Sequence, residues 1–443
     1  MIDTIFAPLT LKGHCSIYVI RISGEKVREC MKRLGIKKQL KHREATLCTL
    51  KDNENKPLDE ALVIYFENPN SFTGEDIVEL NLHCSNYIIS KVVEIILSVD
   101  TVRLAKRGEF SKRAFLNGKI DLMQAESIAD LVNSETELQH KLAINQLQGK
   151  NSNFYNKLRG KIVEVLSIVE AFIDFPEEEI PQELENEINA KVQNIIEEIN
   201  KNLNDNKVGE KIRDGFHIAI IGEPNSGKST LLNYLSKRDV AIVSDIAGTT
   251  RDVIEVNLDI SGIPVILYDT AGIRETTDVI ENEGVKRAID KAQMADLKIL
   301  VMSVDNLDIN QKILELVDEN TIILLNKIDL GKKIDLDKFN FKGNKIIEIS
   351  LKDKTNIDNF IQILQEKLES IVSPNIDTTI TNERYRRELI KAVEFLQAFD
   401  FSLPIEINAE NIRMSADCIG KITGKINSEE ILDNIFSKFC IGK

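Results

Sequence analysis

A glycine-rich loop between an apolar run and a helix limits the possible folds more than any other feature of this sequence. The loop, residues 222–229 (GEPNSGKS), follows HIAIIG, precedes STLLNYL and fits the pattern G-x-x-x-x-G-K-[ST]. Glycines let the backbone wrap a phosphate chain, whose charge meets successive N–H groups and the helix N-terminus. We predict that Lys228 reaches the β- and γ-phosphates of a nucleotide and that Ser229 binds Mg²⁺.

The surrounding sequence alternates short apolar runs with helix-length segments. Five such runs lie between Phe216 and about residue 372, namely FHIAIIG, PVILYD, LKILVMSV, TIILLNK and NKIIEIS. This alternation predicts buried strands in a mostly parallel, doubly wound α/β sheet.

Polar segments at the ends of three of these strands predict the rest of the nucleotide site. Residues 269–272 (DTAG) place a carboxylate near the metal and a glycine N–H near the γ-phosphate. Residues 326–329 (NKID) end in a carboxylate that accepts both guanine N1–H and its 2-amino group, which selects GTP over ATP. Residues 350–352 (SLK) are expected in the last loop that contacts the base.

The catalytic part of this site departs from a Ras-type GTPase, because Ile273 stands where a glutamine orients water. Arg251 is one candidate for an arginine finger. A monovalent cation held by Asn225 and by carbonyls of the 244–249 loop is another source of positive charge. Glu281 is the candidate water-orienting residue. The complete set predicted to contact GTP is Asn225, Ser226, Gly227, Lys228, Ser229, Thr230, Ser244, Asp245, Ile246, Ala247, Gly248, Thr249, Thr250, Asp269, Thr270, Ala271, Gly272, Asn326, Lys327, Asp329, Ser350, Leu351 and Lys352.

The remaining sequence predicts an α+β domain and a discontinuous all-helical domain. CSIYVIRI (15–22) and ALVIYF (61–66) read as strands, with a helix at 86–98. From Ile120 the apolar residues recur at helical spacing, and the pattern returns after the segment 373–374. We predict an N-terminal domain at 1–118, a helical domain in two halves at 119–211 and 373–443, and an inserted G domain at 212–372.

Composition limits the function classes. The net charge of −14 is unusual for a protein that coats nucleic acid, but residues 1–43 hold ten Lys or Arg and three Asp or Glu. RNA would therefore meet a local basic patch, although a solvated helix face explains such a stretch equally well. No run of 18 apolar residues and no signal peptide is evident, and the six cysteines show no C-x-x-C spacing. We expect a cytoplasmic protein with reduced thiols and no membrane contact.

The whole chain resembles the MnmE/TrmE family of tRNA modification GTPases. The stretches that carry this resemblance are DTI at the start, VIRISG (19–24), SFTGEDIVEL (71–80), RGEFSKRAFLNGKIDLMQAESIADLV (107–132), EAFIDFPEEEIP (170–181), AGTTRD (247–252), DTAGIRET (269–276) and the terminal FCIGK.

The resemblance implies a GTPase that works with a flavin-dependent partner of the MnmG/GidA type. Together they would form a carboxymethylaminomethyl or aminomethyl group at C5 of the wobble uridine of certain tRNAs. The one-carbon unit would come from a 5-formyl- or methylene-tetrahydrofolate, and FAD would enter only through the partner. The N-terminal domain would bind the folate and form a homodimer, the two proteins would form a heterotetramer, and paired G domains would hydrolyse GTP to GDP in a K⁺-dependent way.

Site residues follow by motif position. The implied K⁺ ligands are Asn225, Ser244, Ile246 and Thr249, the implied Mg²⁺ ligands are Ser229 and Thr250, and the implied folate contacts are Arg21, Glu79, Lys119 and Lys443. These positions also have plain alternatives. Arg21 could be an exposed strand cation, Lys119 a solvated lysine at a helix start, and Glu79 a partner in a surface ion pair. Two loops depart from the family pattern, LKGHCS (11–16) and His83-Cys84-Ser85, where glycines are usual. Altered backbone geometry is expected there.

Cys440, four residues from the C-terminus, allows three interpretations. A prenylated signalling GTPase carries a cysteine there, but Lys443 in the last place does not fit that motif. An inert buried cysteine is the general default. A reactive thiol delivered to the folate site is the interpretation that we favour, and it makes Cys440 a candidate catalytic residue beside Lys228 and Glu281. A ribosome-assembly GTPase of the Era or Der kind is the competing function, but neither a GXXG-bearing RNA domain nor a second P-loop is present.

Overall fold

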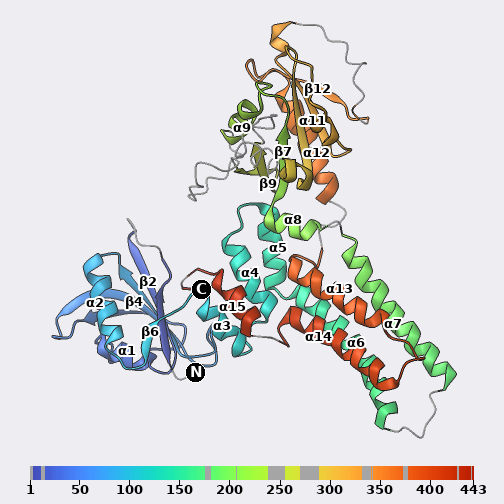
Figure 1. Cartoon of the computed structure of the whole chain (residues 1–443). Coiled ribbons are helices and arrows are strands. Elements are labelled where there is room, and N and C mark those ends of the chain that lie inside the picture. Colours follow the sequence, from blue (N-terminus) through green and yellow to red (C-terminus); the bar gives the residue numbers. More distant parts are fainter. Residues whose placement is uncertain are drawn as a thin grey trace, which may run out of the picture. The chain divides into compact units, whose positions relative to one another are not determined.

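The structure, a computed structural model, forms two compact units that are described separately (Figure 1). The first comprises Met1–Ala129, Gln146–Glu164 and Arg413–Lys443, and the second comprises Asp130–Asn145 and Val165–Ile412. The residues that the structure describes are 3–10, 15–174, 181–205, 207–237, 255–269, 289–331, 341, 343–372, 378–426, 429–440 and 442–443.

The first unit contains a mixed six-stranded sheet in the order β3-β4-β5-β2-β1-β6. Its neighbouring strands pair antiparallel, except for the parallel pair β1 and β6. The strands are β1 (Thr4–Pro8), β2 (Ile17–Ser23), β3 (Ala45–Lys51), β4 (Pro57–Phe66), β5 (Ile77–His83) and β6 (Val102–Leu104).

The two faces of this sheet differ in cover. Alternate residues such as Ile20, Val63 and Leu80 pack into one core with α1 (Val27–Arg33) and α2 (Asn86–Leu97). On the opposite face, Phe110 of α3 (Glu109–Leu116) covers the β1 end of the sheet, where it packs with Ile5 and Ala7. The predicted α+β fold of this region is confirmed.

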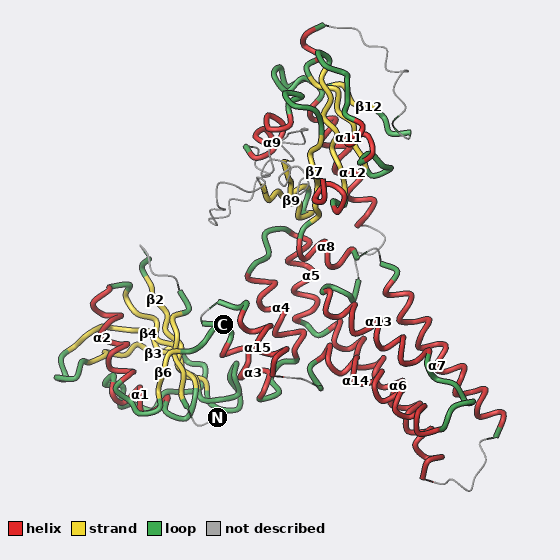
Figure 2. The backbone as a smooth tube through the Cα atoms, viewed as in Figure 1, coloured by secondary structure: helices red, strands yellow, loops and turns green. Residues whose placement is uncertain are grey.

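The second sheet has the order β12-β11-β10-β7-β9-β8, and its pairs are parallel except β8 with β9 (Figure 2). One face packs against α9 (Lys228–Ser236) and α12 (Ile357–Val372), and the other packs against α11 (Gln311–Glu315). The strands are β7 (Phe216–Ile221), β8 (Glu255–Ile260), β9 (Ile263–Asp269), β10 (Leu297–Ser303), β11 (Thr321–Asn326) and β12 (Ile346–Glu348). The doubly wound sheet is confirmed, and β8 is an edge strand that the sequence prediction omitted.

Helices before and after this second sheet form the all-α part of the chain, as predicted. They are α4 (Leu122–Val132), α5 (Glu137–Leu147), α6 (Lys150–Asp174), α7 (Gln182–Leu203), α8 (Val208–Asp214), α13 (Glu383–Gln397), α14 (Ile405–Thr423) and α15 (Glu429–Ser437). Within the described residues, no helix combines the length and apolar character needed to cross a bilayer.

The segments that lead into and out of the second sheet are fastened to each other. The Arg386 guanidinium of α13 binds the carboxylates of Asp205 and Glu210, at 2.5 and 2.9 Å, and all three residues are at least nine-tenths buried. The Thr378 hydroxyl donates to Asp205 Oδ2 over 2.8 Å. In α8 the backbone of Gly209 lies so close to Ile380 that a Cβ atom would stand 2.2 Å from the Ile380 carbonyl oxygen.

This contact predicts opposite effects for two helical glycines. Gly209→Ala would force α8 away from residue 380 and should lower the free energy of unfolding by about 1–3 kcal/mol. Gly160→Ala in α6 is the matched control, because no described atom outside its own stretch of helix backbone lies within 4 Å of its added Cβ. That control should raise the free energy of unfolding by about 0.5–1 kcal/mol through helix propensity. Calorimetric unfolding of both variants measures the difference, and equal effects would contradict the contact.

Candidate functional site

The glycine-rich loop between β7 and α9 has the conformation that its glycines require. Gly222 and Gly227 have φ values of 146° and 112°. A Cβ atom on Gly222 would stand 2.2 Å from the Val301 carbonyl oxygen, and one on Gly227 would stand 2.2 Å from Asn326 Nδ2. Side chains larger than hydrogen therefore do not fit at these two positions.

Lys228 lies inside this loop. Its ammonium donates to the carbonyl oxygens of Gly222 and Glu223 over 2.8 and 2.9 Å, and the side chain is buried. The charge is thus held by neutral acceptors of the loop itself, where a phosphate would be cradled. The next two predicted residues, Ser229 and Thr230, are exposed in the first turn of α9.

A candidate Mg²⁺ site lies where α9 meets the end of β9. The Ser229 hydroxyl donates to Asp269 Oδ2 over 2.8 Å. The other carboxylate oxygen, Asp269 Oδ1, and the Ser226 hydroxyl are buried and have no hydrogen-bond partner among the described residues. A buried, unpaired carboxylate oxygen is costly. The Asp269 carboxylate and the Ser229 hydroxyl together form the hard oxygen donor set that Mg²⁺ prefers, so these residues fit the ion.

The predicted base-binding residues meet at the ends of β11 and β12. The Asn326 amide donates to the Ser226 carbonyl oxygen over 2.9 Å and accepts from Leu351 N over 3.1 Å. Asn326 therefore ties the phosphate loop to the predicted base loop. The Asp329 carboxylate accepts from the Ser350 hydroxyl over 2.8 Å and lies 4.0 Å from the Lys352 ammonium. This carboxylate is already oriented by two of the residues predicted beside it.

Two further residues hold the site and were not predicted in these roles. Asp305, two residues beyond β10, binds the Lys327 ammonium over 2.9 Å. The Ser303 hydroxyl and this ammonium lower the pKa of Asp305. Glu223 accepts from Asn310 N over 2.6 Å and so joins the phosphate loop to the start of α11. The usable signal for Asp305 was its place after a parallel strand, where site residues gather.

The remaining predicted nucleotide and cation residues lie outside the described residues. They are Ser244, Asp245, Ile246, Ala247, Gly248, Thr249, Thr250, Thr270, Ala271, Gly272 and Glu281, together with Arg251 and Ile273. Of the predicted K⁺ ligands the structure describes Asn225, which is exposed and has a φ of 59°.

A second group of predicted residues lies in the first unit. Arg21 and Glu79 face each other across β2 and β5, and their side chains form an ion pair of 2.7 Å. The Arg21 guanidinium lies 5.5 Å from the ring centroids of both Phe72 and Phe110. The Lys119 ammonium donates to the Pro69 carbonyl oxygen over 2.9 Å. Arg21 and Lys119 therefore contact the same loop, residues 69–74.

The C-terminal tail is placed against the same region. The Phe110 N–H donates to the Lys443 carbonyl oxygen over 3.2 Å, and the Gly108 N–H donates to the Cys440 carbonyl oxygen over 3.5 Å. A Cβ atom on Gly442 would stand 2.4 Å from the Pro8 carbonyl oxygen. Phe110 thus contacts both Arg21 and the terminal residue. The Cys440 and Lys443 side chains are exposed.

The loop with the unusual sequence His83-Cys84-Ser85 has ordinary backbone angles. Neither Cys84 nor Ser85 is among the described residues with positive φ, and Ser85 has a φ of −105° as the N-cap of α2. The loop therefore adopts backbone angles that any residue allows, and no strain follows from the missing glycines. His83 donates its N–H to Asp59 Oδ2 over 3.0 Å.

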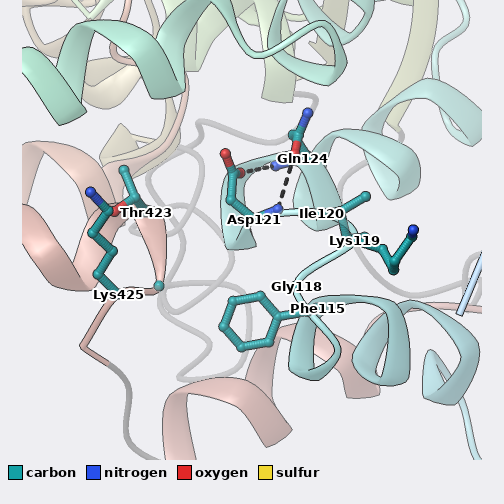
Figure 3. Close-up of a pocket in the computed structure, with 9 residues that line it drawn as sticks. Phe115, Gly118, Lys119, Ile120, Asp121, Gln124, Thr423 and Lys425 are labelled. Atoms are coloured by element: carbon teal, nitrogen blue, oxygen red, sulfur yellow. Dashed lines mark hydrogen bonds between the residues drawn. The ribbon is translucent and has the colours of Figure 1, made fainter. Parts of the chain in front are cut away.

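A pocket of about 380 Å³ lies beside Lys119 (Figure 3). Figure 3 shows Lys119 on one side, with Thr423 and Lys425 on the opposite side. Asp121 and Gln124 exchange hydrogen bonds that cap the start of α4, with 2.8 Å from Gln124 N to Asp121 Oδ1. Burial raises the pKa of Asp121, although hydrogen bonds from Ser152 and from α4 oppose this shift. The Asp121 and Gln124 side chains of the pocket therefore serve the start of α4, and the Thr423 hydroxyl donates to the Gly420 carbonyl oxygen over 3.4 Å.

Comparisons with known proteins cover the whole chain. A family described as "GTP-binding protein TrmE N-terminus" matches residues 4–119, and one described as "MnmE helical domain" matches residues 122–440. The chain is 45% identical to the tRNA modification GTPase MnmE of Rickettsia typhi and 46% identical to that of Rickettsia prowazekii, with 100% of each chain covered. Among solved structures, Era of Aquifex aeolicus bound to GDP and AlF4 is 28% identical over 34% of this chain and 56% of Era, with a TM-score of 0.28.

The position of Asp329 predicts a change of base preference. Asp329→Asn removes the predicted acceptor for guanine N1–H and the 2-amino group, and should weaken GTP binding about 100-fold, or about 3 kcal/mol. The new amide can donate to the 2-oxo group of xanthine, so XTP should bind more tightly than GTP. Fluorescence titration with both nucleotides measures this change. Asp353→Asn is the control, because Asp353 is an exposed carboxylate in the same loop. Unchanged GTP affinity in the Asp329 variant would contradict the assignment.

Proposed function

The chain belongs to the MnmE family of tRNA modification GTPases, and we propose that it uses GTP hydrolysis to drive the modification of C5 of the wobble uridine in certain tRNAs. The product would be a carboxymethylaminomethyl or aminomethyl group. The observation that carries this proposal is the match to MnmE proteins along the full length of both chains. It includes the nucleotide site and the tail that contacts the N-terminal sheet.

Hydrolysis of GTP rests on residues of both described and undescribed segments. Lys228 would move its ammonium from the loop carbonyls to the β- and γ-phosphates when GTP enters, because a charged acceptor binds it more strongly. Mg²⁺, held by Ser229 and Thr250, would neutralise charge that develops on the phosphates. Glu281 would orient the attacking water. The pairing of Ser229 with Asp269 supports this arrangement.

A potassium ion would supply the charge that an arginine finger supplies elsewhere. Its proposed ligands are Asn225, Ser244, Ile246 and Thr249, the middle two through backbone oxygens. Asn225 supports this role because it is exposed at the phosphate loop, where its φ is 59°.

Tetrahydrofolate would bind at the group formed by Arg21, Glu79, Lys119 and Lys443. Two contacts support this site: Arg21 lies over Phe72 and Phe110, and Phe110 N–H holds the last residue of the chain. The Lys119 ammonium has a neutral acceptor, so its charge remains available for the carboxylates of a folate tail. The tail also brings the exposed Cys440 to this region, where its thiol would take part in one-carbon transfer.

We further propose a homodimer through the N-terminal sheet and a heterotetramer with a flavoprotein of the MnmG/GidA type, which would supply FAD. The open sheet face supports an interface. Its residues Ile17, Leu47 and Leu62 are 58%, 61% and 42% exposed, and Leu47 and Leu62 stand opposite each other on β3 and β4. Neighbouring exposed apolar side chains on a flat face are typical of contact surfaces.

Potassium should accelerate GTP hydrolysis specifically. At equal ionic strength and fixed Mg²⁺, turnover in KCl should exceed turnover in NaCl at least about tenfold, which corresponds to about 1.4 kcal/mol of transition-state stabilisation. Asn225→Gly should lose this preference, because glycine accepts the φ of 59° but provides no side-chain oxygen. Equal rates of the unchanged protein in the two salts would remove the cation from the mechanism.

Cys440→Ser should separate the two reactions. In cells that lack the gene, nucleoside analysis of tRNA should show unmodified wobble uridine, and the unchanged gene should restore the modification. The Cys440→Ser gene should not restore it, although the purified variant should hydrolyse GTP at the normal rate. Cys15→Ser is the control, because Cys15 is also an exposed thiol of the first unit. Normal modification in the deletion strain would refute the proposed function itself.

A further inference from the structure

Residues 32–43 (KRLGIKKQLKHR), here called the basic segment, have a charge that contrasts with the rest of the chain. The segment holds six Lys or Arg and no Asp or Glu, whereas the whole chain has a net charge of −14. It begins in the last turn of α1 and ends just before β3. Neither the nucleotide site nor the group around Arg21 uses it.

The apolar residues of the basic segment fix the direction of its cations. Leu34, Ile36 and Leu40 are buried in the core beneath the N-terminal sheet. The residues between and around them, Lys32, Arg33, Lys37, Lys38, Lys41, His42 and Arg43, are all exposed.

Backbone hydrogen bonds hold this arrangement. Lys51 N donates to the Leu34 carbonyl oxygen over 3.0 Å, and Arg43 N donates to the Tyr65 carbonyl oxygen over 2.8 Å. Both ends of the basic segment are therefore tied to the sheet. The backbone that carries the cations is therefore held near β3, unlike that of a flexible tail, so little backbone entropy would be lost when they bind a partner.

The positive charge of the basic segment is almost uncompensated within the described residues. Lys41 forms an ion pair of 3.2 Å with Glu44. The Lys38 ammonium donates to the Leu47 carbonyl oxygen over 2.9 Å, and the Arg43 guanidinium donates to the Asn70 carbonyl oxygen over 3.2 Å. Those neutral acceptors orient the two side chains and leave their charge available. No described carboxylate lies within ion-pair distance of Lys32, Arg33 or Lys37.

We propose that the basic segment binds the phosphate backbone of the tRNA substrate. This inference rests on the proposed function, which makes tRNA the polyanion that the protein meets. Exposed lysines and arginines on a backbone that is tied to the sheet fit a phosphate backbone, which they contact without reading sequence. The segment therefore contributes affinity and position, whereas selection of the tRNA lies elsewhere. Lys32 and Arg33 also stand in the last turn of α1, where cations offset the helix dipole.

Charge reversal tests the proposal. The variant Lys32→Glu/Arg33→Glu/Lys37→Glu should bind purified tRNA at least about tenfold more weakly than the unchanged full chain in moderate salt. The slope of log K against log salt should become shallower by about 2–3, because about three phosphate contacts are lost. The control Lys141→Glu/Lys157→Glu/Lys201→Glu changes the net charge equally, at exposed lysines of α5, α6 and α7. It should bind tRNA within about threefold of the unchanged chain and keep the salt slope.

Folding is monitored by GTP turnover, which should be normal in both triple variants because neither touches the nucleotide site. If the Glu variant fails to fold, Lys32→Gln/Arg33→Gln/Lys37→Gln replaces it, with the same direction of effect and a smaller loss of affinity. Equal losses of tRNA affinity in the basic-segment variant and in its control would overturn the proposal. Absence of tRNA binding by the unchanged chain would also overturn it.

The outcome is distinguishable from a failure of the proposed function. In one outcome, the variant Lys32→Glu/Arg33→Glu/Lys37→Glu binds tRNA normally but no longer retains the flavoprotein partner. In that case the basic segment binds a protein, and the RNA proposal is wrong although the proposed function stands. Normal modification of the wobble uridine in the gene-deletion strain would instead refute the proposed function, whatever the binding data show.

Discussion

The site in the first unit depends on one buried guanidinium. Arg113 of α3 is fully buried and binds Asp3, Glu75 and Glu109 at 2.9, 3.1 and 3.2 Å. Arg103 adds bonds to Asp3 and Glu109 at 2.7 and 2.6 Å. Burial alone would raise the pKa of Glu109, but the hydrogen bond and charge of Arg103 lower it to about 2. The carboxylate therefore stays ionised beside both guanidinium groups.

This ion network fixes the position of α3, to which the C-terminal tail is hydrogen-bonded. It connects the start of β1, the loop before β5 and the first turns of α3, three segments that are far apart in the sequence. Loss of one partner would leave a buried charge uncompensated, which typically costs about 3–5 kcal/mol. Gly108 and Phe110, whose N–H groups hold the terminal tail, flank Glu109 in this same turn. The network thus sets the position of Cys440 without touching it.

The sequence predicted those parts of the molecule in which local pattern and chemistry agree. The phosphate loop was predictable because its glycines, its lysine and the flanking apolar run all require the same turn. Asn326, Asp329 and Ser350 were predictable as neighbours because they follow parallel strands, which end at one edge of the sheet. The order of the two sheets, the edge strand β8 and the partner of Lys327 depend on contacts between distant segments, and no local pattern encodes them. For His83-Cys84-Ser85, the missing glycines led us to expect altered backbone geometry, but only the structure shows its form, an ordinary cap of α2. The predicted roles of Glu281, Thr250 and the other residues in 238–254 and 270–288 stay predictions.

The fastening of Asp205, Glu210, Thr378 and Arg386 has a consequence for modularity. Asp205 precedes and Thr378 follows the part of the chain that contains the second sheet, and the two residues share a hydrogen bond of 2.8 Å. The two segments that connect this part to the helices therefore lie next to each other. A domain attached in this way can be gained, lost or exchanged without separating the helices on either side.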